Sequence, residues 1–71
     1  MKNIIYDALF KKYESDKANA LATLEIYFNN PSGIGEHPGI IEEMDEMIEK
    51  LATAQGNIDT LEGNYKRTYS K

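Results

Sequence analysis

Apolar residues recur along two stretches of the chain with a spacing that alternates between three and four residues. This spacing places side chains on one face of an α-helix and is typical of a coiled-coil-like seam. The first stretch spans residues 4–28 and is interrupted only by Lys17, whereas the second spans residues 40–65 without interruption. The predicted seam residues are Tyr6, Phe10, Tyr13, Ala20, Leu24 and Tyr27 in the first stretch and Met44, Met47, Leu51, Ala54, Ile58, Leu61 and Tyr65 in the second.

Residues 29–39, NNPSGIGEHPG, separate the two stretches and hold both prolines and three of the five glycines. Proline and glycine interrupt helices and favour turns. Pro38 suits the first position of a helix, where a missing N–H costs nothing. We therefore predict an all-α fold, an antiparallel helical hairpin. Its expected single domain is 1–71, with a helix over about 3–29, a loop over about 30–37 and a helix over about 38–66.

Gly56 and Gly63 fall inside the second period, and each costs about 1 kcal/mol relative to alanine in a helix interior. The seam nevertheless continues in phase beyond Gly56 to Tyr65, which favours one continuous helix. A kink after Gln55 is the alternative. Residues 68–71 are expected to have no regular structure.

Both seams are widened on their flanks by further apolar residues. A chain of 71 residues buries little surface on its own, and without cysteine it has no disulfide to compensate. We therefore predict self-association, as a dimer of hairpins forming a four-helix bundle or as a larger closed oligomer. The alternative is a monomeric hairpin. The flanking residues are Ile5, Leu9, Leu21, Phe28, Ile41 and Ile48.

Charge is distributed unevenly along the chain, whose net charge is −4. Residues 18–49 carry seven acids and no lysine or arginine, which gives −7, while the remainder carries eight bases and five acids, which gives +3. A hairpin would therefore have an acidic loop end and a mildly basic open end. Helix-dipole matching explains part of this, and electrostatic orientation of subunits or partners is the alternative. The acidity argues against broad nucleic-acid binding.

No targeting or membrane-spanning segment is recognisable. Charged residues interrupt the apolar residues of the N-terminal segment, and no stretch approaches the roughly 20 apolar residues of a membrane span. We expect a soluble, cytoplasmic protein.

The loop residues are the strongest candidates for a binding site. Gly33 and Gly35 could present backbone N–H groups to an anion, and His37 could titrate or bind a metal with help from Glu36. No strand precedes the glycines, so neither nucleotide-binding glycine motif is supported. A histidine that caps or braces the loop is the favoured interpretation. The candidate residues are Asn30, Gly33, Gly35, Glu36 and His37.

Catalytic and metal signatures are weak. Glu42, Glu46 and Glu49 share a helix face, but a solvated face explains them better than a cation site, and no Glu-x-x-His pair is present. The spacing of the serines relative to His37 does not support a triad. We predict no catalytic residues, no metal, no cofactor and no enzymatic activity.

The segment YFNNPSGIGEHPGIIEEMDEMIEKLATAQGNIDTLE, about half of the chain, resembles small uncharacterised proteins of tailed bacteriophages, notably T4-like and marine myoviruses. In those proteins an aromatic-N-x-P-x-G-I-G-E-H-P loop joins two helices, which corresponds to Tyr27–Pro38 here. They commonly carry an acid where this chain has Gly39, which leaves the capping of the second helix open. The resemblance implies a viral source, a helical hairpin and location in the host-cell cytoplasm, but no chemistry.

Two functions remain. The favoured hypothesis is a homo-oligomeric protein-interaction module that binds a host or virion protein. The alternative is a small helical oligomer that sequesters a nucleotide immune signal without cleaving it, with phosphates held at the basic open end.

Overall fold

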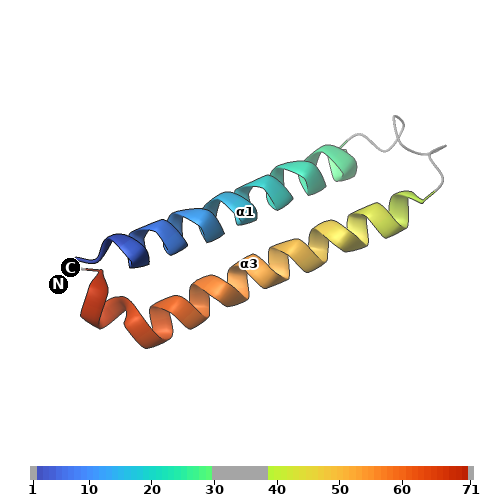
Figure 1. The fold of residues 1–71 in the computed structure, drawn as a ribbon. Helices are drawn as coiled ribbons and strands as arrows, with labels where there is room; N and C mark the ends of the chain where they lie inside the picture. Colours follow the sequence, from blue (N-terminus) through green and yellow to red (C-terminus); the bar gives the residue numbers. More distant parts are fainter. Residues whose placement is uncertain (1, 30–38, 71) are drawn as a thin grey trace.

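The computed structural model describes residues 2–29 and 39–70, which form two long helices lying antiparallel (Figure 1). Helix α1 runs over Ile4–Asn29 and helix α3 over Ile40–Tyr69. The Cα atoms extend over 52 × 14 × 14 Å, so the hairpin is a narrow rod. The predicted all-α helical hairpin is confirmed, and residues 2–29 and 39–70 contain no strand.

The core lies along the predicted seam. Among the residues that the structure describes, all six buried side chains are seam positions, and six further seam residues are half-buried, including Met44 and Met47. Tyr65, which the pattern also assigns to the seam, is 51% exposed and lies outside the core. Asn3 lines the same cavity as Tyr65, but its short polar side chain caps α1. The buried residues are Tyr6, Ala20 and Leu24 of α1 and Ala54, Ile58 and Leu61 of α3.

The open end of the hairpin is held together by capping and by a backbone bond between the helices. The Asn3 Oδ1 accepts hydrogen bonds from the backbone N–H groups of Ile5 (2.9 Å) and Tyr6 (3.2 Å), as an N-cap residue does. The Asn3 N–H itself donates to the Tyr69 carbonyl at 3.0 Å. This bond joins the start of α1 to the end of α3.

Helix α3 begins and ends later than the sequence predicts. Gly39 has φ 85° and ψ 9°, a left-handed conformation that an α-helix does not contain, and the helix begins at Ile40. Pro38, the predicted first helical residue, lies outside the described residues. At the other end, the Ser70 N–H and Oγ both donate to the Lys66 carbonyl, at 3.1 and 2.6 Å. This cap supports helix through Tyr69, where the sequence suggested irregular chain.

The second helix is continuous through both of its internal glycines, as the in-phase seam predicts. A Cβ atom added at Gly56 or Gly63 would meet nothing within 4 Å, so both glycines face open space. The packing of Ile58 and Leu61 against α1 holds this part of the helix despite the low propensity of glycine.

Candidate functional site

The loop residues proposed as a binding site, Asn30, Gly33, Gly35, Glu36 and His37, lie outside the described residues. The described part of the chain offers other candidates: two flanks beside the seam, and the hollows and apolar patches on them.

One flank carries residues that come directly before a seam position. Asp16 and Thr23 of α1 and Lys50 and Asn57 of α3 all have this offset, and all four line one groove. The Tyr27 hydroxyl joins the two helices on the same flank, nearer the loop end. It donates to the Glu43 Oε2 at 2.9 Å.

This hydrogen bond is the main reason why the pKa of Tyr27 lies above its ordinary value of 10.0, because only the protonated hydroxyl can donate it. Partial burial and the Glu43 charge raise the pKa further.

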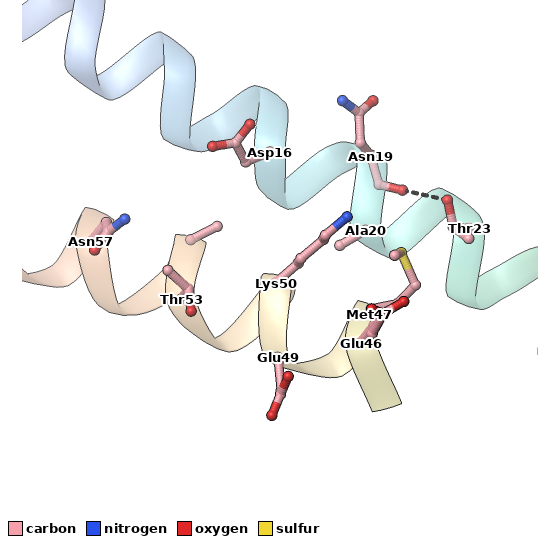
Figure 2. Close-up of a pocket in the computed structure, with 11 residues that line it drawn as sticks. Asp16, Asn19, Ala20, Thr23, Glu46, Met47, Glu49, Lys50, Thr53 and Asn57 are labelled. Atoms are coloured by element: carbon pink, nitrogen blue, oxygen red, sulfur yellow. Dashed lines mark hydrogen bonds between the residues drawn. The ribbon is translucent and has the colours of Figure 1, made fainter. Parts of the chain in front are cut away.

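The groove, about 670 Å³ in volume, lies at the middle of the rod, and Figure 2 shows the residues that line it. It exists because the seam there is built of small side chains, Ala20 and Ala54, which leave space between the helices. Lys50 extends from α3 toward α1 across this space (Figure 2). The lining residues are Asp16, Asn19, Ala20, Thr23, Glu46, Met47, Glu49, Lys50, Thr53, Ala54 and Asn57.

The groove is a poor site for an anion. It carries three acids against one base, Lys50. Several of its polar groups already have partners within their own helix, because Asp16 accepts from Lys12 at 2.9 Å and Thr23 donates to the Asn19 carbonyl at 2.9 Å. The Asp16 carboxylate raises the pKa of Lys12, chiefly through this hydrogen bond and then through its charge. Within residues 2–29 and 39–70, no group of three or more His, Cys, Asp and Glu side chains could hold a metal ion.

The opposite flank carries residues that come directly after a seam position. Leu21 follows Ala20 and Ile48 follows Met47, and the helical repeat gives Phe28 and Ile41 the same offset one heptad away. All four side chains are exposed: Leu21 by 44%, Ile48 by 48%, Phe28 by 66% and Ile41 by 72%. We call these four residues the loop-end patch, since all of them lie in the half of the rod nearest the loop.

A second apolar surface lies at the other end of the rod. A cavity of about 280 Å³ opens there between the first turns of α1 and the last turns of α3. Its wall is almost wholly apolar or aromatic, and the Tyr65 and Tyr69 rings stand 6.2 Å apart within it. We call it the open-end cavity. It is lined by Asn3, Ile5, Tyr6, Leu9, Leu61, Tyr65 and Tyr69.

A third hollow, of about 750 Å³, lies along the last turns of α3, and Lys66 and Arg67 are among the residues that line it. Lys66 is 3.6 Å from the Glu62 carboxylate, and the C-terminus of a helix carries negative dipole charge. Both features weaken its attraction for phosphate.

Sequence reasoning identified the flanking apolar residues but not their arrangement. Ile5 and Leu9 precede seam residues, whereas Leu21 and Phe28 follow them, so the two pairs belong to opposite flanks. This difference of offset was available in the sequence. The contribution of Tyr69 to the cavity was missed because the helix was expected to end before it.

Comparison of the chain with protein-family models, curated proteins and solved structures found no match. Neither α1 nor α3 is both long enough and apolar enough to span a membrane, among the residues described.

Proposed function

We propose that this protein is a non-enzymatic interaction module that associates with copies of itself and presents the assembled rods to another protein. The exposure of large apolar side chains beside an otherwise well-formed seam carries this proposal. Leaving Phe28 and Ile41 in water forgoes roughly 1.5–3 kcal/mol for each side chain, which a partner surface can recover.

The small core supports the same conclusion. Within residues 2–29 and 39–70 six side chains are buried, and the two at the middle of the rod, Ala20 and Ala54, contribute little apolar area. Chains of this size commonly gain the missing stability by association. Self-association would cover the flanks that a single hairpin leaves open.

The further partner is proposed to be a host or virion protein. This rests on the resemblance of the loop and second helix to small proteins of tailed bacteriophages. The alternative, sequestration of a nucleotide, has less support, because the central groove is acidic and the basic hollow lies at the C-terminal end of α3.

Light scattering coupled to size-exclusion chromatography, over a range of protein concentrations, tests self-association. We expect a mass above 8.1 kDa for the parent chain, and a lower mass for Phe28→Glu. Ile26→Glu is the matched control: Ile26 is 64% exposed and Phe28 is 66% exposed, but Ile26 precedes the seam residue Tyr27 and so lies on the flank opposite the loop-end patch. A parent chain that stays folded and monomeric at every concentration would contradict the proposal.

A further inference from the structure

We infer that the loop-end patch of one copy occupies the open-end cavity of a second copy, so that the protein assembles head to tail. The inference rests on the proposed function and specifies its interface. The occupant of the cavity is thus the loop-end patch of another copy of this chain.

The loop-end patch is an exposed apolar surface, whereas the open-end cavity is a hollow, and we call Phe28 and Ile41 of the patch the plug. Phe28 and Ile41 are the most exposed members of the loop-end patch, at 66% and 72%, and they flank the loop at the tip of the rod. The open-end cavity is a hollow of about 280 Å³ walled by aromatic and aliphatic side chains. An aromatic side chain inserted into such a pocket is the usual energetic centre of a protein interface.

Charge complementarity favours contact between unlike ends. All six charged side chains within residues 18–29 and 39–49 are acidic, whereas residues 2–17 and 50–70 carry seven bases and five acids, which gives +2. Head-to-tail contact brings the acidic end of one copy to the basic end of the next, which favours correct encounter. Contact between two loop-end patches would instead bring twelve acids together and would oppose association.

The two surfaces cannot be joined within one two-fold contact, because they lie on opposite flanks and at opposite ends of the rod. Leu21 follows a seam position and belongs to the patch, whereas Leu9 precedes one and lines the cavity. A contact between different surfaces of identical copies is heterologous. It repeats from copy to copy, and it forms a ring where the rotation closes.

Two single substitutions and their mixture test the inference. Phe28→Glu disrupts the plug and leaves the cavity intact, whereas Ile5→Glu disrupts the cavity and leaves the plug intact. Ile5 is 68% exposed, so neither substitution removes a core contact. Ile26→Glu and Ile4→Glu are the controls, since Ile4 is 83% exposed and does not line the cavity. Both new side chains are acidic, so contact between the substituted patch of one variant and the substituted cavity of the other stays unfavourable.

We expect each variant alone to be monomeric, with a dissociation constant raised tenfold or more, and both controls to assemble as the parent does. An equimolar mixture of the two variants should give a one-to-one heterodimer in light scattering, because one intact plug and one intact cavity remain. Circular dichroism confirms that each variant is helical. If Phe28→Glu is not helical, Ile41→Glu replaces it, and if Ile5→Glu is not helical, Tyr65→Glu replaces it.

Two results overturn the inference while leaving self-association intact: a mixture that stays monomeric, or one variant that retains the parent mass. A parent chain that is itself monomeric overturns both the inference and the proposed function. The failures are therefore distinguishable.

Discussion

The two ends of the rod are held together in different ways. At the open end, Tyr6, Ile58 and Leu61 are buried, and a backbone bond joins Asn3 to Tyr69. At the loop end, Leu24 is the one buried residue within 21–29 and 39–48. The two helices are joined there by the hydrogen bond from Tyr27 to Glu43. The better packed end is thus the one farthest from the loop.

The difference has a physical reason. Residues near a short connection are kept close by the chain itself, so few contacts are needed to hold them, whereas distant residues require stronger packing. Apolar side chains near the loop are consequently free to remain on the surface. At the open end Ile58 and Leu61 are committed to the core, and at the loop end Phe28 and Ile41 are available to a partner.

The largest effect is expected from truncating the packed end. Ile58→Ala removes a side chain that is only 4% exposed and should lower the free energy of unfolding by about 2–5 kcal/mol. Ile41→Ala, at a position 72% exposed, should change it by no more than about 0.5 kcal/mol in a Phe28→Glu background. Urea denaturation followed by circular dichroism measures both. Equal losses would show that the two ends are packed alike.

The start of α3 should respond next. Gly39 has φ 85°, so Gly39→Ala should cost about 1–2 kcal/mol through its backbone alone. Steric conflict does not contribute, because the added Cβ would lie 3.7 Å from the Glu42 Oε2. Gly39→Asn should cost less, since asparagine tolerates this conformation better. Melting temperatures that rank alanine above asparagine would exclude this explanation.

The cap at the open end should have a similar or smaller effect. Asn3→Ala removes the acceptor of two helical N–H groups and should cost about 0.5–2 kcal/mol. Asn3→Asp keeps a side-chain oxygen and serves as the control. Thermal melts distinguish them, and equal melting temperatures for parent and alanine variant would mean that the cap is unimportant.

The smallest effect concerns the Tyr27–Glu43 bond and appears at alkaline pH. Because the folded state raises the pKa of Tyr27 above 10.0, folding binds this proton more tightly than the unfolded chain does. The bond's contribution is therefore complete below about pH 10, the unfolded value, and is lost as pH rises through the higher folded pKa.

A tyrosinate absorbance titration of the parent minus that of Tyr27→Phe isolates the Tyr27 transition. Its midpoint should lie above 10.0. A midpoint at or below this value would show that the bond is absent in solution.

The architecture could be predicted from sequence because its cause is local. The three-four spacing of the seam and the cluster of proline and glycine around residues 30–38 determine two helices and one bend. Burial follows the same spacing, since all six residues buried in the described part of the chain are seam positions. The failures lie at the ends of α3, where Gly39 adopts a left-handed conformation and Ser70 caps Lys66. Such single-residue geometry leaves no periodic signal.

The candidate surfaces were less predictable, because they depend on how the two helices meet. The sequence shows that Leu9 and Leu21 flank a seam, but the cavity also needs Tyr69 beside the first turn of α1. The central groove depends on Ala20 and Ala54 lying near each other across the helices. Neither follows from one helix alone.

The antiparallel register also orders the events of folding. The Tyr27–Glu43 pair spans 16 residues, whereas Asn3 and Tyr69 are separated by almost the whole chain. Closing the shorter loop costs less entropy, so we expect the hairpin to nucleate beside the loop and to close toward the termini. Contacts made by Ile58 would then form late, and its truncation should accelerate unfolding more than it slows folding. Fraying accordingly begins with the loss of the hydrogen bond between Asn3 and Tyr69. A second copy bound in the open-end cavity would slow the opening of that end.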